Sequence, residues 1–155
     1  MKNCLFSLII SILYMPFYGC ISLSSQNKLT LLQGVQGQVF EQKGNAMPMK
    51  GQKISKGAYF HTMVYIFEPT SSLEVEGLKG QICTKVNTVL VDSTMTDTEG
   101  KYKIALKPGK YSLMVKFEEG FFVPYFSGAN ELSIIEVLPK TFSELDIIVN
   151  VKASY

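Results

Sequence analysis

Short runs in which apolar and polar residues alternate follow one another along most of this chain. In 102–106, 111–117 and 145–151 nearly every second residue is apolar, and the intervening residues are mostly polar or charged. Period-two alternation is typical of strands that bury one face. No stretch from residue 34 onward keeps a 3.6-residue period long enough to indicate a helix. The pattern therefore predicts an all-β domain.

The β-rich runs and their boundaries predict a seven-stranded sandwich. The expected strands cover residues 35–41, 60–68, 83–91, 100–106, 110–117, 132–138 and 145–152.

Turn residues separate these runs. Asp97 to Gly100 supplies an Asx-type turn that ends in glycine, and Lys107 to Lys110 places proline before glycine. We expect both turns to join neighbouring antiparallel strands. Residues 42–59 and 69–80 are longer, rich in Lys, Gly and Ser, and are expected to be mobile insertions.

The beginning of the chain has the pattern of an export signal. A lysine precedes an apolar run at residues 5–15 (LFSLIISILYM), which is too short for a comfortable membrane span of about 20 residues. Residues 17–20 (FYGC) then resemble a bacterial lipoprotein signal, in which Cys20 would be acylated and become the mature N-terminus. Cleavage near Ser22 or Ser24, giving a soluble exported product, and an uncleaved leader remain the alternatives. We therefore expect a signal peptide at 1–19, a tether at 20–33 and one domain at 34–155.

Composition narrows the classes of partner. The chain has 155 residues, a formal net charge of +2 and 15 basic residues, all of them lysine. Without arginine and without a concentrated positive field, nucleic acid is not expected as a partner. His61 is the single histidine, which excludes sites that need two imidazoles.

Cysteine usage agrees with export. Once the leader is removed and Cys20 is acylated or lost, Cys83 stands alone and no intramolecular disulfide can form. We interpret Cys83 as a small buried apolar residue.

Three motifs carry a resemblance to a known family. Residues 37–41 (GQVFE), 96–102 (TDTEGKY) and 106–115 (LKPGKYSLMV) follow the pattern of carboxypeptidase regulatory-like domains. The resemblance covers residues 34–152, and its nearest echo of the family's Pro-Leu-x-Gly-Ala motif is 46–51 (AMPMKG). It implies a seven-stranded, Greek-key, transthyretin-like β-sandwich. Tyr111 is then expected to tie its hydroxyl to a loop, as tyrosine corners do.

Catalytic and metal-binding groups are sparse. His61 as the base of a hydrolase is the weakest interpretation, because no spacing links it to a serine or carboxylate. Enzymes that share the transthyretin-like sandwich rely on several histidines and an arginine, or on paired Tyr and His ligands to iron. This chain has one histidine and no arginine, so it carries neither set of catalytic groups. Asp92, Asp97 and Glu99 could hold Ca²⁺, although capping of a turn explains them better. No enzyme activity, metal or cofactor is predicted.

The segment 121–126 (FFVPYF) is the most suggestive surface candidate. Phe121, Phe122, Tyr125 and Phe126 fall in an expected loop, where aromatic rings could stack on sugars or anchor a protein. The alternative is that two or three of them cap the open end of the sandwich.

These observations together predict a non-catalytic interaction or structural module of the bacterial cell envelope. We expect it to be exported and lipid-anchored at Cys20, to face the periplasm and to bind an envelope protein. The alternative function is a glycan-binding module that uses the 121–126 aromatics. Beyond the lipid, no contact with the membrane is expected.

Overall fold

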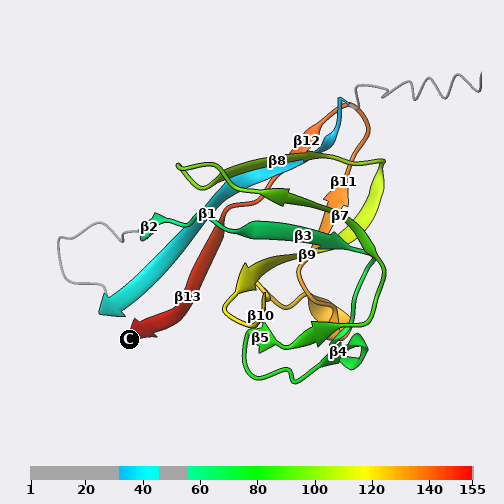
Figure 1. Cartoon of the computed structure of the whole chain (residues 1–155). Helices are drawn as coiled ribbons and strands as arrows, with labels where there is room; N and C mark the ends of the chain where they lie inside the picture. Colours follow the sequence, from blue (N-terminus) through cyan, green and yellow to red (C-terminus); the bar gives the residue numbers. More distant parts are fainter. Residues whose placement is uncertain (1–31, 46–55, 155) are drawn as a thin grey trace, which may run out of the picture.

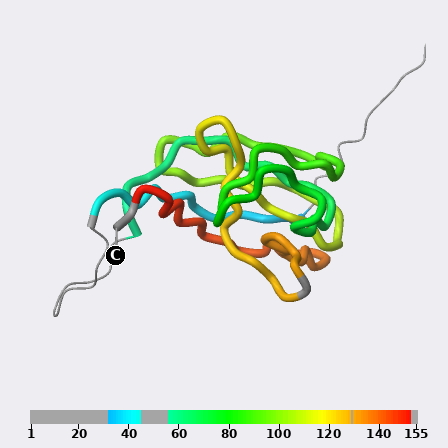
Figure 2. The backbone as a smooth tube through the Cα atoms, turned by 90° about the horizontal axis from the view of Figure 1, so that it is seen from below, coloured from blue at the N-terminus to red at the C-terminus, as the bar shows by residue number. Residues whose placement is uncertain are grey.

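The computed structural model describes residues 32–45 and 56–154, and within them the chain is all-β, as predicted. A five-stranded sheet is built around the long strand β1 (Figure 1). Its members are β1 (Gly34–Asn45), β2 (Ala58–Tyr59), β8 (Lys101–Ala105), β12 (Phe142–Glu144) and β13 (Ile147–Ser154). Strands β8 and β2 pair antiparallel with one edge of β1, while β12 and β13 pair parallel with the other. Figure 2 shows β1 and β13 running side by side.

A six-stranded sheet forms the second layer. Strand β9 (Gly109–Phe117) lies between β3 (Met63–Phe67) on one side and β10 (Gly120–Phe122) and β11 (Ile134–Val137) on the other. Strand β7 (Leu90–Met95) ends the sheet beyond β3, and β5 (Ile82–Cys83) ends it beyond β10. All pairings within this sheet are antiparallel.

The main apolar core lies between the two sheets. It takes Val35, Val39, Tyr102, Ile104, Ile147 and Val149 from the five-stranded sheet, and Val64, Ile66, Leu113, Val115, Phe117, Phe122, Ile135 and Val137 from the other. Because both sheets contribute alternate residues to one buried layer, the architecture is that of a β-sandwich.

A second apolar cluster covers the outer face of the six-stranded sheet. Phe67, Cys83, Met114, Val123 and Leu132 are buried in it. The covering segments include η1 (Ser72–Glu74), η2 (Gly128–Asn130) and a two-stranded sheet of β4 (Val75–Glu76) and β6 (Lys85–Val86). Residues 69–80, expected as a mobile insertion, contain η1 and β4, and Val75 and Leu78 pack against this second cluster.

The predicted strand 83–91 is also wrong as a single element. Its residues divide among β5, β6 and the start of β7, which belong to three different pairings. The run has strand-like composition throughout, but Cys83 and Val86 pack into the second cluster while Leu90 begins an edge strand. Burial against different partners breaks the run into three pieces.

Both predicted turns have a different role from the one expected. The 97–100 turn connects β7 to β8, and the 107–110 turn connects β8 to β9, so each carries the chain from one sheet to the other. The local chemistry is nevertheless as predicted, because Asp97 Oδ1 accepts the Glu99 amide at 2.9 Å. Gly100 has φ +70°, and a Cβ there would lie 2.4 Å from the Val39 carbonyl oxygen. The turn therefore requires glycine.

The predicted signal peptide at 1–19, Cys20 and the expected tether as far as residue 31 lie outside the described residues, as does the 46–51 motif. In the part of the chain that is described, no helix is long and apolar enough to cross a membrane.

Candidate functional site

Two rows of polar side chains cross the exposed face of the five-stranded sheet. Val35, Val39, Tyr102 and Ile104 are buried, so their neighbours at 36, 38, 101 and 103 project from the opposite face. Strand register places Lys103 and Glu144 on either side of Gln36, and Lys101 opposite Gln38. Asp146 completes the second row by accepting the Gln38 amide. We call these the Gln36 row (Lys103, Gln36, Glu144) and the Gln38 row (Lys101, Gln38, Asp146).

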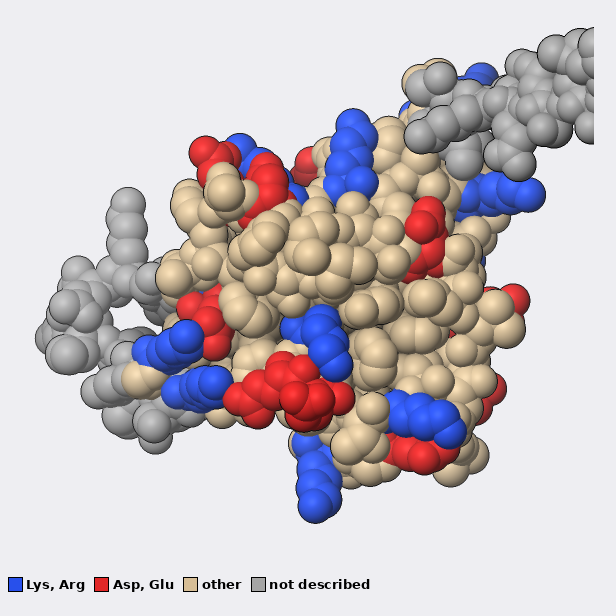
Figure 3. All heavy atoms as spheres, in the orientation of Figure 1, with Lys and Arg blue, Asp and Glu red and all other residues tan. Residues whose placement is uncertain are grey.

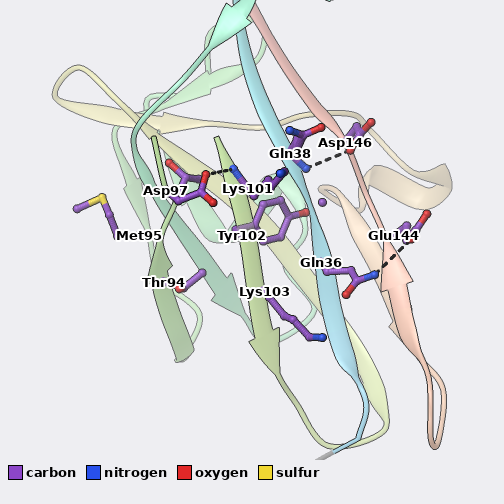
Figure 4. A pocket seen from close by; sticks show the side chains of 12 residues that line it. Gln36, Gln38, Thr94, Met95, Asp97, Lys101, Tyr102, Lys103, Glu144 and Asp146 are labelled. Atoms are coloured by element: carbon purple, nitrogen blue, oxygen red, sulfur yellow. Dashed lines mark hydrogen bonds between the residues drawn. The ribbon is translucent and has the colours of Figure 1, made fainter. Parts of the chain in front are cut away.

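Both rows line a groove of about 710 Å³. Residues 94–97, from the end of β7 and the following turn, line it as well, and Figure 4 shows the two rows lying across β8, β1 and the 144–146 segment. The groove therefore draws on both sheets and on the turn that joins them.

Hydrogen bonds hold the glutamines and carboxylates in place. Gln36 Nε2 donates to Glu144 Oε1 at 3.2 Å, and the Gln38 backbone amide donates to Asp146 Oδ1 at 3.0 Å (Figure 4). Gln38 Nε2 donates to the Glu99 carbonyl at 3.2 Å. The side chains are thus oriented before any ligand arrives.

Charge at the edge of the groove is paired locally. Lys56 Nζ lies 2.8 Å from Asp146 Oδ2, and this hydrogen bond, with that from the Gln38 amide, lowers the pKa of Asp146 below its usual value despite partial burial. Lys101 is paired with Glu99, whose carboxylate raises the Lys101 pKa. Both groups are therefore fully charged at neutral pH.

An inner row lies directly beneath the two polar rows. Tyr102 is the residue between Lys101 and Lys103, Gly37 lies between the glutamines, and Leu145 lies between the carboxylates. Tyr102 Oη donates to the Leu145 carbonyl at 2.6 Å, and burial raises the Tyr102 pKa. A Cβ on Gly37 would lie 2.0 Å from that same carbonyl oxygen. Glycine thus leaves room for a tie between β8 and the 144–146 segment.

Aromatic residues lie at both ends of the polar rows. At one end, Tyr59 and Ile148 flank Phe40 in register, and Tyr59 is 59% exposed. At the other end, Phe142 pairs with Gly34, and the Lys103 ammonium lies 4.1 Å from the centre of its ring. The face therefore presents rings at its ends and hydrogen-bonding groups between them.

The structure separates the four aromatic residues predicted at 121–126. Phe121 and Phe122 belong to strand β10 rather than to a loop, and Phe122 is completely buried in the main core. Phe121 packs edge-on against Tyr65 and Phe67. Tyr125 is half-buried and donates its hydroxyl to the Ile134 carbonyl, whereas Phe126 is 49% exposed. The segment presents one largely exposed ring.

The remaining predicted residues have local structural roles. His61 is exposed, with Nδ1 3.3 Å from the Asp97 carbonyl oxygen. Asp92 Oδ1 accepts the Ser93 amide. Cys83 is buried, as expected, and burial raises its pKa. Among residues 32–45 and 56–154, no three His, Cys, Asp or Glu side chains cluster in a way that could hold a metal ion.

Neither row was identified from the sequence. The signal was present in part, since Lys101, Lys103, Gln36 and Gln38 occupy the polar positions of alternating strands. Their assembly depends on pairing between residues more than one hundred positions apart, such as Gln36 and Glu144. A single sequence does not reveal that register.

Charges of both signs are interspersed on the face shown in Figure 3, with a broad uncharged area over β7 and β3. No family model matches the chain, and no curated protein matches it.

Proposed function

We propose that this protein is a non-catalytic binding module of the bacterial cell envelope, held at the membrane by a lipid on Cys20. Its contact surface is the groove on the five-stranded sheet. The observation that carries the proposal is the pair of polar rows, in which side chains from distant parts of the chain are aligned and oriented around one concavity. Such convergence of polar groups in a groove is characteristic of ligand sites.

The finer fold assignment is part of the same proposal. We infer a transthyretin-like, Greek-key sandwich of the carboxypeptidase regulatory-like family. Among the described strands, seven have four or more residues, namely β1, β3, β7, β8, β9, β11 and β13. Connections that alternate between sheets support a Greek key. Tyr111 also donates its hydroxyl to the Lys107 carbonyl, as the family pattern implies.

Groove chemistry favours binding over catalysis. A general acid or base works best with a pKa near the operating pH. The pKa of Asp146 is instead lowered by Lys56, and Glu144 accepts a hydrogen bond from Gln36. Asp146 is therefore suited to accept hydrogen bonds from a ligand in its ionised form, and Glu144 already accepts one from Gln36.

Location in the envelope rests on the N-terminal sequence. The apolar run at 5–15 and the FYGC motif support export and acylation, and the periplasmic side is proposed because no acidic residue directly follows Cys20. Mixed surface charge and the lack of arginine make nucleic acid a poor partner.

A glycan-binding site at 121–126 is the second candidate that the sequence suggests. Only Phe126 remains largely exposed there, while Phe122 is core and Phe121 is packed. The geometry therefore favours the groove over this segment as the place of contact.

Photo-crosslinking in intact cells tests the proposal. A photoreactive amino acid replaces Lys103 in the groove, and matched probes replace Lys79 and Phe126 on other surfaces. We expect one recurrent envelope component to be captured from position 103, and its capture to be lost when Gln36→Ala and Gln38→Ala are added. Equal capture from all three positions, or capture that is insensitive to the two glutamine substitutions, would contradict the proposal.

A further inference from the structure

The polar rows combine donors and acceptors in a repeating order. Each row places an ammonium, an amide and a carboxylate across three neighbouring segments. Lysine only donates hydrogen bonds, an ionised carboxylate only accepts them, and glutamine does both. A ligand that matches such a row must carry many groups that can donate and accept within a short distance, and hydroxyl groups have this property.

We propose that the groove binds a linear, uncharged polysaccharide chain, laid across the rows from the Phe142 end to the Tyr59 end. This inference rests on the proposed binding function of the groove and names its ligand class.

Charge balance argues against an ionic ligand. Two lysines, Lys101 and Lys103, face the carboxylates of Asp97, Glu144 and Asp146 around the groove. Asp146 is further neutralised by Lys56, and Lys101 by Glu99. Opposite charges at such short range cancel beyond the first layer of contacts. The groove therefore attracts neither polyanions nor polycations, and its complement is a neutral chain rich in hydroxyl groups.

The dimensions of the face suit an extended chain. Along β1, positions 34, 36, 38 and 40 lie on this face two residues apart. The face therefore continues beyond the two rows, and from Phe142 to Tyr59 it extends about 20 Å at 3.3 to 3.4 Å per residue. This length accommodates several sugar rings end to end. Tyr59 is exposed and can stack on the apolar face of a terminal ring, because aromatic side chains supply large contact areas for few rotatable bonds.

The site is organised in advance of binding. Tyr102 and Leu145 are tied beneath the rows, and Leu145 N–H donates to the Gln36 carbonyl at 2.9 Å. Fixed side chains lose less conformational entropy on binding than free ones. A stiff sheet face with paired polar groups therefore suits hydroxyl recognition, in which each single hydrogen bond contributes little.

An extended peptide is the competing ligand, and it is disfavoured by where the groups lie. Peptides commonly add a strand to a sheet edge through backbone hydrogen bonds. Here the aligned groups are side chains on a face, and the β1 backbone between them is already paired on both sides by β8 and β12. Within the rows no strand edge is open, and a peptide could add a strand only at the outer edge of β8, which pairs with β1 alone.

Calorimetric titration of the full chain tests the ligand class. The probes are cellobiose, cellotetraose and cellohexaose, the corresponding malto- and chito-oligosaccharides, and an oligogalacturonate as the charged counterpart. We expect saturable binding of at least one neutral series, stronger for the tetraose than for the biose and insensitive to added salt. The matched variants are Tyr59→Ala and Phe126→Ala, which remove exposed rings from different surfaces, and Gln36→Ala with Lys79→Ala as a polar control.

Tyr59→Ala and Gln36→Ala should each weaken binding about twofold to tenfold, while Phe126→Ala and Lys79→Ala leave it unchanged. Binding of the charged oligomer alone, or neutral binding that Phe126→Ala abolishes and Tyr59→Ala does not, overturns the inference. If no glycan binds but the position-103 crosslink still captures an envelope protein, the ligand class is wrong and the proposed function stands. If the crosslink also fails, the ligand class and the proposed function are both wrong.

Discussion

Tyr102 reaches across Gly37 and donates its hydroxyl to the carbonyl oxygen of Leu145, 2.6 Å away. The bond connects β8 to the segment between β12 and β13, and it lies under the middle of the groove. One partly buried hydrogen bond thus contributes to the stability of the sandwich and to the spacing of the side chains above it.

Removing the Tyr102 hydroxyl should lower the stability of the protein more than removing an exposed one. Tyr102→Phe leaves a partly buried carbonyl without this donor, so we expect the free energy of unfolding to fall by about 1 to 3 kcal/mol. Tyr111→Phe is the matched control, because the Tyr111 hydroxyl bonds the Lys107 carbonyl at an exposed site. Urea denaturation of both variants measures the difference, and equal losses would show that the Tyr102 tie has no special role.

The aromatic segment offers a second comparison within six residues. Phe122→Ala should destabilise the protein by about 3 to 5 kcal/mol, because it removes a completely buried ring from the main core. Phe126→Ala should change stability by less than about 0.5 kcal/mol, since its ring is half in solvent. Thermal unfolding separates the two outcomes. Similar melting temperatures for both variants would contradict the buried position of Phe122.

The paired carboxylate beside the groove predicts a pH dependence. The pKa of Asp146 in the folded protein is lower than its usual 3.8, chiefly because Lys56 donates to it, so its stabilising contribution is present above 3.8 and is lost as the pH falls through the lowered value. Because the pair is largely exposed, we expect Asp146→Asn to cost less than about 1 kcal/mol at neutral pH.

The difference in free energy of unfolding between wild type and Asp146→Asn should therefore disappear in acid. Denaturant titrations of both proteins at neutral pH and well below pH 3.8 measure it. A gap that stays constant with pH would show that the ionised carboxylate is not the stabilising group.

Strand β7 ends the six-stranded sheet beyond β3, and Leu90, Val91 and Met95 are exposed along it, as is Val89 just before it. Exposed apolar edges promote aggregation, and proteins blunt them with charges and bulges. Asp92 lies in mid-strand and accepts the Ser93 amide at 2.8 Å, and the register shifts between Ile66 and Phe67 where they pair with β7. We interpret Asp92 as a charged residue that opposes pairing of this edge with another chain.

Asp92→Ala should expose the Ser93 amide and increase self-association without unfolding the domain. Light scattering at rising protein concentration measures the effect, and Asp146→Asn serves as the control for loss of an acidic side chain elsewhere. A variant that stays as monodisperse as the wild type would show that Asp92 does not prevent self-association.

The sequence predicted the all-β class well because period-two alternation in runs such as 102–106 has no helical counterpart. It did not predict how strands divide between sheets. The Asp97 to Gly100 turn has the same local chemistry whether it closes a hairpin or crosses to the other sheet, and packing on opposite layers decides between them. The run at 83–91 has strand-like composition but divides among β5, β6 and β7, since composition does not reveal which surface each residue will cover.

The candidate site was harder to predict than the fold. The aromatic residues at 121–126 suggest a binding surface in the sequence. In the structure Phe122 is buried in the main core, and Phe121 packs against the second cluster. Gln36, Gln38, Lys101 and Lys103 look like ordinary solvent-facing residues until Glu144 and Asp146 are placed beside them. The site arises from a register between distant strands, which local patterns do not encode.

Amide chemical-shift mapping locates the binding surface on the sandwich. The labelled full chain is titrated with the neutral oligosaccharide that gives the strongest calorimetric response, or with the component captured from position 103 if none does. We expect the largest shifts on residues 36–38, 101–103 and 144–146, with Tyr59 at their margin. Shifts concentrated instead at 121–126 or along β7, with the two polar rows unchanged, would contradict it.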